Sequence, residues 1–329
     1  MSNALYLAWS GVLGQQAGAQ PPALHLAAAT QPGSAPADAG GLGPAMLVLV
    51  AIGSCVLAVW IIRCLARPGR LRMRNTPGRP NSLTIVHIIV VALLMILALN
   101  LAAGLLRQLL PGQPTTQPTQ PTQPATQAAT QQDEGLSDAR LEIAAGAVGF
   151  VVWLAASLAV AAGTFRHGLS RGLGLSLRHW ICDLGRAIFG YLAVTPLWVG
   201  LAILFAYVFN LLNIPARIHP ALQYLSAFTP PWRLLAVFEA VILAPLAEEV
   251  FFRGLVQSFF RRVFHSPRLA ILLASAIFAG IHTNEPQAIP SLFALALALG
   301  YNYERTGRLT GPILIHAIFN AVNLAMWKG

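Results

Sequence analysis

The chain has 329 residues, of which 56% are hydrophobic and only 10% are charged. This composition excludes an ordinary soluble domain and is typical of a polytopic membrane protein. The formal net charge is +10 and comes almost wholly from arginine, because Lys328 is the only lysine. In a membrane protein such an excess marks cytoplasmic loops rather than a nucleic-acid surface. We therefore expect an all-α protein that is embedded in the lipid bilayer and binds no nucleic acid.

The front of the chain divides into three regions of different composition. Residues 1–42 are expected to form a poorly ordered tail. A cleaved signal peptide is an alternative interpretation of a short apolar stretch in this tail, although no basic region precedes that stretch. Residues 43–110 hold two long apolar runs and predict a two-helix membrane region. The Pro/Gln/Thr-rich segment 111–140 follows, and its low-complexity part cannot bury a core, so an extended, flexible linker is predicted.

Residues 141–329 are predicted to form a multi-helix membrane region. Over the whole chain, apolar runs that are long enough to cross or enter a bilayer lie at about 43–62, 83–106, 143–165, 187–212, 234–260, 269–283, 289–303 and 312–327. This pattern predicts about eight helices. The runs 269–283 and 289–303 are shorter than the ~20 residues of a usual span, so the "TNEP" connection between them is expected to dip into the membrane and admit water.

Arginines are concentrated in alternate loops between these runs. The loops hold 15 of the 20 arginines, namely Arg63, Arg67, Arg70, Arg72, Arg74, Arg79, Arg166, Arg171, Arg178, Arg186, Arg261, Arg262, Arg268, Arg305 and Arg308. By the positive-inside rule these loops face the cytoplasm, which places the N-terminus and the Pro/Gln/Thr-rich linker outside. Short hydrophilic loops and a low lysine content favour a prokaryotic inner or plasma membrane.

Three charges lie in the middle of one apolar run, in the stretch "APLAEEVFFRG". Each charge at bilayer depth costs roughly 2.5–3.5 kcal/mol on insertion scales, so Glu248, Glu249 and Arg253 must be paired, hydrated or functional. Glu249 and Arg253 are four residues apart on one helix face, which predicts an ion pair. Glu248 lies about 100° around the helix and is left available. Pro245 lacks a backbone donor and is expected to kink the helix and free a carbonyl nearby.

Two histidines lie in later apolar runs. His282 closes the segment "FAGIH", while His316 opens "HAIFN" and is followed one turn later by Asn320. A single histidine or asparagine inside a membrane is commonly a helix–helix hydrogen-bonding residue. Together with Glu248, however, three such residues at similar depth are difficult to explain by packing, because each polar group has its own insertion cost. Glu239 also lies inside an apolar run without a partner in the sequence, and we interpret it as a protonated or supporting residue.

The chemistry open to one carboxylate and two imidazoles is limited. Glu248, His282 and His316 can bind zinc and leave a fourth position for water. Alternatively, Glu248 deprotonates water without a metal while His282 orients it. We favour zinc as the cofactor, because two imidazoles beside a carboxylate form a ready cation site, and keep the metal-free route as the alternative. An amide such as that of Asn320 can donate to a developing oxyanion, so either route predicts hydrolysis of an amide bond.

The three segments also match a family pattern. E-E-x-x-x-R appears as "EEVFFR", F-x-x-x-H as "FAGIH" and H-x-x-x-N as "HAIFN", in that order and on separate apolar runs. Over about residues 180–329 the chain therefore resembles the CAAX prenyl protease and bacteriocin-processing (CPBP, Abi) family of intramembrane proteases. The resemblance implies an intramembrane metalloendopeptidase whose substrate is a membrane-associated protein or peptide, lipid-modified in the eukaryotic members.

The resemblance also implies a role for each motif residue. Glu248 and His282 would activate the attacking water, His316 and Asn320 would stabilise the oxyanion, and Glu249 and Arg253 would hold the first motif in place. The runner-up interpretation is a catalytically silent membrane scaffold or a bacteriocin self-immunity protein with the same fold. A proton-coupled transporter would also explain buried charge, but the two halves of the sequence show no inverted repeat with broken helices.

Overall fold

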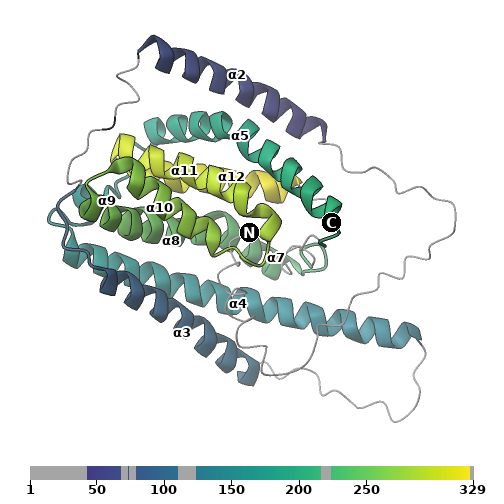
Figure 1. Cartoon of the computed structure of the whole chain (residues 1–329). Coiled ribbons are helices and arrows are strands. Elements are labelled where there is room, and N and C mark those ends of the chain that lie inside the picture. Colours follow the sequence, from purple (N-terminus) through teal and green to yellow (C-terminus); the bar gives the residue numbers. More distant parts are fainter. Residues whose placement is uncertain (1–42, 68–72, 74–78, 110–123, 216–223, 327–329) are drawn as a thin grey trace.

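The computed structural model describes residues 43–67, 73, 79–109, 124–215 and 224–326, and its regular structure in these ranges consists of helices (Figure 1). No strand is present in them; one isolated β-bridge pairs Asn81 with Phe165. The predicted all-α fold class is thereby confirmed. The predicted N-terminal tail lies outside the described residues.

Four helices in the described ranges are long and apolar enough to cross a membrane. They are α2 (Pro44–Ala66), α3 (Ile85–Leu109), the part of α4 (Pro124–Thr164) that begins at Gly135, and α5 (Trp180–Leu211). Each coincides with one of the first four apolar runs of the sequence. The large side chains of α2 and α3 are mostly exposed, as expected for helices that face lipid.

A single helical run from residue 230 to 264 carries the first motif. It comprises α7 (Pro230–Phe238), the π-helical segment η4 (Glu239–Leu243), α8 (Ala244–Glu249), the π-helical segment η5 (Val250–Gln257) and α9 (Ser258–Phe264). The remaining elements are α10 (Pro267–Gly280), the short 3₁₀ helix η6 (Pro286–Ala288), α11 (Ile289–Thr306) and α12 (Thr310–Met326). The last four predicted runs are thus helical too, with small shifts at their ends.

The predicted linker is shorter in the structure than the sequence suggested. The sequence predicts a linker over residues 111–140, with its low-complexity part extended, yet α4 already begins at Pro124. The physical reason is that proline is tolerated in the first turn of a helix, while the alanine, glutamine and glutamate residues that follow favour helix formation. Residues 111–123 lie outside the described ranges.

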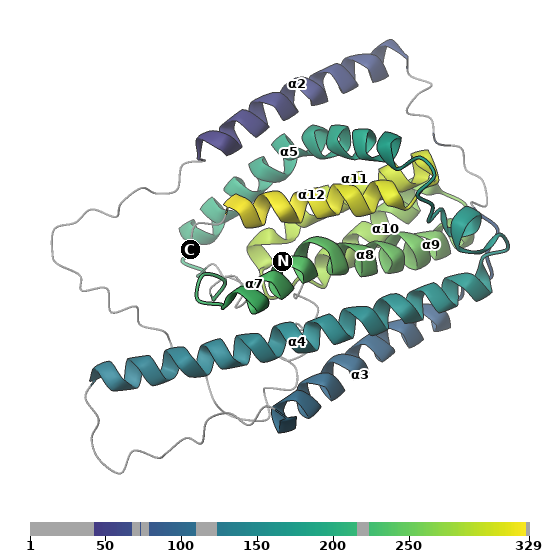
Figure 2. The same ribbon diagram turned by 180° about the vertical axis from the view of Figure 1, so that it is seen from behind.

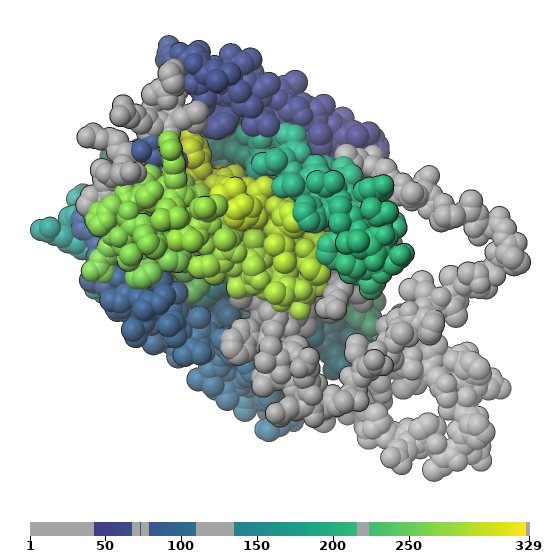
Figure 3. All heavy atoms as spheres, viewed as in Figure 1, coloured from purple at the N-terminus to yellow at the C-terminus, as the bar shows by residue number. Residues whose placement is uncertain are grey.

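The helices are arranged in layers around the C-terminal half. Helix α2 packs along α5, and α3 packs along α4, on opposite sides of the molecule (Figures 1 and 2). Between α5 and α4 lie α8 to α12, with α11 and α12 against α5 and with α8 and η5 against α4. The lime and yellow segments of α10 to α12 fill the middle of one face beside α5 (Figure 3). The motif-bearing helices therefore form the centre of the bundle.

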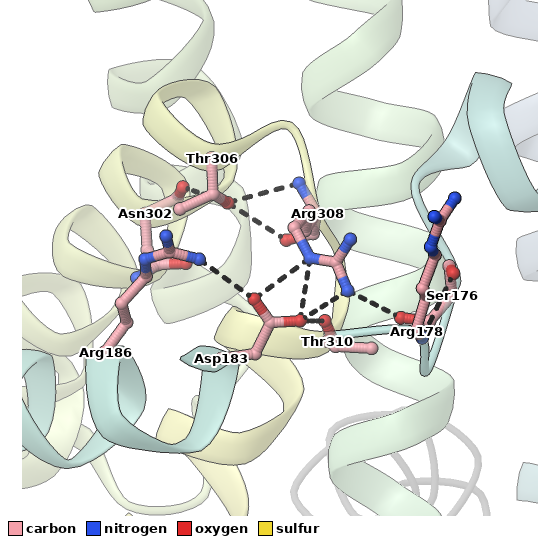
Figure 4. Close-up of polar contacts among 8 residues, drawn as sticks. All are labelled: Ser176, Arg178, Asp183, Arg186, Asn302, Thr306, Arg308 and Thr310. Carbon is pink, nitrogen blue, oxygen red and sulfur yellow. Dashed lines mark hydrogen bonds and ion pairs between the residues drawn. The ribbon is translucent and has the colours of Figure 1, made fainter. Parts of the chain in front are cut away.

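The start of α12 is fastened by a buried carboxylate of α5. Asp183 is 1% exposed and accepts hydrogen bonds from Arg308 Nε at 2.9 and 2.7 Å and from Thr310 Oγ1 at 2.5 Å (Figure 4). Arg308 also donates to the Ser176 carbonyl at 2.8 Å. Because Thr310 is the first residue of α12, this cluster fixes the helix that carries His316 against α5.

We expect Asp183→Ala to lower the free energy of unfolding by about 1.5–3 kcal/mol, because it leaves Arg308 and Thr310 without their charged acceptor. Arg186→Ala is the control. Its guanidinium contacts the same carboxylate at 3.3 Å but is 55% exposed, so its loss should cost at most about 1 kcal/mol. Thermal unfolding in detergent measures both, and equal stability of the two variants would contradict this role for Asp183.

Candidate active site

The predicted ion pair of the first motif is present and buried. Arg253 Nη1 lies 2.8 Å from Glu249 Oε1, and the two side chains are 1% and 0% exposed. Arg253 Nη2 also donates to the Ala296 carbonyl of α11 at 3.2 Å, and its guanidinium lies 4.7 Å from the centre of the Phe278 ring of α10. The ion pair therefore joins the first motif to two other helices, and its charges are balanced inside the bundle.

Glu248 differs from Glu249 in its surroundings. Its side chain is 1% exposed, and neither carboxylate oxygen has a hydrogen-bond partner among the described residues. The nearest cationic or imidazole group is His316, whose Nε2 lies 3.8 Å from Glu248 Oε2. This separation is too long for a direct hydrogen bond. The carboxylate is thus buried and held beside an imidazole, with neither oxygen bonded to a described residue.

The two histidines are oriented in the same manner. His282 Nδ1 lies 2.7 Å from the Phe278 carbonyl, and His316 Nδ1 lies 3.0 Å from Glu249 Oε1. Since a carbonyl or an ionised carboxylate only accepts, each Nδ1 donates its proton. In the neutral ring this leaves Nε2 as the unprotonated nitrogen. The fold therefore fixes the tautomer of both imidazoles and keeps the Nε2 atom of each for chemistry.

The Phe278 ring is the point at which the three motifs meet. Its centre lies 5.0 Å from that of the His282 ring and 5.7 Å from that of His316. Arg253 of the first motif covers the same ring. Phe278 makes an edge-to-face contact with Phe252, with ring centres 5.2 Å apart. Phe252 makes the same kind of contact with Trp153 of α4, with ring centres 6.0 Å apart, and so connects Phe278 to the transmembrane part of the bundle. These rings form an apolar wall on one side of the site.

Asn320 is held by a carbonyl that Pro245 sets free. In η4 the backbone bonds run five residues back, as the bond from the Ala244 N–H to the Glu239 carbonyl shows. The next bond in this pattern would join Pro245 to Ala240, but proline has no N–H. The Ala240 carbonyl instead accepts from Asn320 Nδ2 at 2.7 Å. The expected free carbonyl is therefore found, and it positions the amide of the third motif.

The six predicted site residues are all buried in this region. Direct contacts link Glu249 to Arg253 and to His316, and place His316 beside Glu248. His282 joins through the Phe278 ring rather than through a contact with Glu248. The residue pattern did not identify the carbonyls of Ala240 and Ala296 as acceptors, because a backbone acceptor leaves no mark in residue type.

The predicted zinc ligands agree with this geometry in part. Both histidines have the orientation that is usual for metal ligands, with Nδ1 bonded to an acceptor and Nε2 left over. Within the described part of the chain, however, no three His, Cys, Asp or Glu side chains lie close enough together to hold a metal ion. Glu248, His282 and His316 therefore do not form a zinc site as they stand in this structure, and zinc binding stays a prediction.

Comparison with known families agrees with the motifs. Residues 230–322 match the family model described as type II CAAX prenyl endopeptidase Rce1-like. The matched region begins with α7, ends in α12, and contains all three motifs. It confirms, for this part of the chain, the resemblance that the motifs predicted.

Two curated proteins of Lactococcus lactis subsp. lactis (strain IL1403) are similar to part of the chain. The UPF0177 protein YaiF is 30% identical over 138 residues, which are 41% of this chain and 60% of that protein. The UPF0177 protein YbdI is 26% identical over 102 residues, which are 31% of this chain and 53% of that protein. The chain thus matches little more than half the length of these relatives. No solved structure matches it.

Proposed function

We propose that this chain hydrolyses a peptide bond of a membrane-associated protein or peptide within the bilayer. The match of residues 230–322 to the family model of Rce1-like type II CAAX prenyl endopeptidases supports this proposal. The observation that carries the proposal is Glu248, a carboxylate buried in the bundle with both oxygens unpartnered in the described residues. A buried carboxyl group without a partner costs free energy of folding. A scaffold or immunity protein has no use for it, whereas a hydrolase does.

In the proposed reaction Glu248 accepts a proton from water. The oxygen of that water forms a bond to the carbonyl carbon of the scissile peptide, and the carbonyl becomes an oxyanion. His282, with Nδ1 fixed by the Phe278 carbonyl, presents Nε2 as a second acceptor and orients the water. The C–N bond then breaks, and the proton held by Glu248 moves to the leaving amine. Atoms and charges balance with one water consumed for each bond cut.

The oxyanion is assigned to the third motif. Asn320 Nδ2 has a second N–H beyond the one that it gives to Ala240, and this N–H can donate to the developing charge. For His316 to donate from Nε2, both of its ring nitrogens must carry protons, since Nδ1 already donates to Glu249. Glu249 and Arg253 act through His316 and do not touch the substrate in this scheme.

The substrate is tested with purified full-length protein in proteoliposomes. We expect a quenched fluorescent peptide with a farnesylated C-a-a-X end to be cut before its last three residues, as mass spectrometry of the products would show. The same peptide without the farnesyl group, and an unmodified transmembrane peptide, distinguish a prenyl-specific enzyme from a general intramembrane endopeptidase. If none of the three peptides is cut, the proposal fails for all of these substrate classes.

The proposed mechanism requires no metal. We therefore expect dialysis against a chelator to leave the rate of peptide cleavage unchanged, which separates this route from the zinc-dependent route that the sequence favours. Glu248 would then be the base itself, as derived above. Loss of activity on dialysis that zinc or cobalt restores would contradict this, and would support ligation by Glu248, His282 and His316.

We propose that the arginine-rich loops face the cytoplasm, as their charge indicates. With the native cysteines replaced, a cysteine placed in the Pro/Gln/Thr-rich segment 111–123 should react with an impermeant maleimide added to intact cells. A cysteine placed between Arg63 and Arg79 should react only after the membrane is opened. Labelling of the second position in intact cells would reverse the orientation.

A further inference from the structure

A second buried acid lies close to the proposed site and has no part in the mechanism above. Glu239 is the first residue of η4 and is 2% exposed. Neither of its carboxylate oxygens has a hydrogen-bond partner in the part of the chain that the structure describes. Arg253 has Glu249 and Asp183 has Arg308 as partners, and the unpartnered Glu248 has a role in the proposed mechanism. Glu239 is an exception that its surroundings in the bundle do not account for.

The position of Glu239 connects it to the third motif. The residue that follows it, Ala240, accepts the hydrogen bond from Asn320, and η4 as a whole packs against α12. Asn320 Oδ1 is also buried and unpartnered among the described residues. Glu239 of η4 and Asn320 of α12 thus carry three oxygens that are unpartnered among the described residues, from one carboxyl and one amide. What these oxygens lack is a hydrogen-bond donor.

The distance along the helix separates Glu239 from the reacting atoms. Glu239 precedes Glu248 by nine residues, and at roughly 1.5 Å per residue the two lie about 13 Å apart along the axis. Glu239 is therefore too far away to act on the scissile bond. A peptide bound in an extended conformation spans such a distance in about four residues. The separation suits a subsite that binds the substrate beside the bond to be cut.

We propose that Glu239 is a substrate-binding residue, which accepts hydrogen bonds from main-chain N–H groups of the peptide about four residues from the scissile bond. This inference rests on the proposed endopeptidase function. In the free protein the carboxyl group is buried without a partner, and in the complex the peptide supplies the missing donors. Glu239 positions the peptide and takes no part in the bond-breaking step.

The test compares two substitutions of Glu239 in the full-length protein, with the farnesylated C-a-a-X peptide as the probe. Glu239→Met keeps the size of the side chain but removes the hydrogen-bond acceptor. We expect KM to rise about five- to tenfold with kcat little changed, because the lost hydrogen bond is made equally in the ground state and the transition state. Glu239→Gln keeps an acceptor, and its KM should stay within about twofold of the wild type. Ser157→Ala is the control, since Ser157 Oγ is likewise buried and unpartnered, but lies on α4.

Thermal stability provides a second readout that does not depend on turnover. If the carboxyl group has no partner in the free protein, Glu239→Met should unfold at the same or a higher temperature than the wild type. A clearly lower unfolding temperature would overturn the proposal, because it would show that Glu239 stabilises the fold. An unchanged KM in Glu239→Met, or a KM in Glu239→Gln raised as much as in Glu239→Met, would also overturn it. Absence of any turnover by the wild type would instead count against the endopeptidase function, while the unfolding result would still decide whether Glu239 is unpartnered.

Discussion

Glu248→Gln is expected to lower kcat for peptide cleavage by about 10²–10⁴-fold, the usual contribution of a general base. Glutamine has the shape of glutamate but cannot take a proton from water. Because neither oxygen of Glu248 has a partner in the described residues, the substitution removes no internal hydrogen bond, and the unfolding temperature should not fall. The combination of lost activity and retained stability distinguishes a reacting group from one that holds the fold.

The matched control for this variant is Glu142→Gln. Glu142 is a half-buried carboxyl group on the membrane helix α4 and lies outside the proposed site. Its substitution should leave kcat within about twofold of the wild type, as expected for a change away from the reacting groups. Kinetics with the farnesylated peptide and circular dichroism of both variants complete the comparison. Full activity of Glu248→Gln would end the general-base role.

Arg253→Ala is expected to cause the largest loss of stability, about 3–5 kcal/mol, because it leaves Glu249 as an uncompensated buried charge. The hydrogen bond to the Ala296 carbonyl and the contact with the Phe278 ring are lost as well. We expect low yield from membranes and a strongly reduced unfolding temperature, and Glu249→Ala should behave similarly. Arg253→Lys should recover only part of the stability, since lysine cannot serve two acceptors with the fixed geometry of a guanidinium.

The control for Arg253→Ala is Arg305→Ala, which removes an exposed arginine near the end of α11. Its yield and unfolding temperature should match those of the wild type. If Arg253→Ala were as stable as this control, the ion pair would not hold the first motif in place. The same measurements on Glu248→Gln separate the two neighbouring carboxylates, because only Glu249 is expected to support the fold.

Local features of the site could be predicted from the sequence, and tertiary features could not. The Glu249–Arg253 pair was predicted because both residues lie on one helix, four positions apart, where spacing alone brings side chains together. The contact between Glu249 and His316 joins residues 67 positions apart, and helical periodicity carries no information on such a distance. The family resemblance predicted that these residues share a site, but not that Glu249 would fix the orientation of the His316 ring.

Two features of the backbone that the sequence pattern did not specify have a common cause. The π-helical turn of η4 directs the Ala240 carbonyl to Asn320, and α4 begins inside the predicted linker. Both depend on backbone geometry around a proline, Pro245 in the first case and Pro124 in the second. Proline marks a break in a sequence pattern, yet in a helix it can equally occupy the first turn or leave an acceptor for a neighbour. Only the packed structure shows which of these occurs.

The most direct test of the central claim is a comparison of membrane proteomes from cells that contain the wild-type chain or Glu248→Gln at equal levels. New peptide termini within or beside membrane-embedded segments should be present with the wild type and absent with the variant, and they identify the substrate without prior assumption about prenylation. If Glu248 is the general base, these termini should disappear when its carboxylate is replaced by an amide. Identical termini in the two proteomes would contradict it.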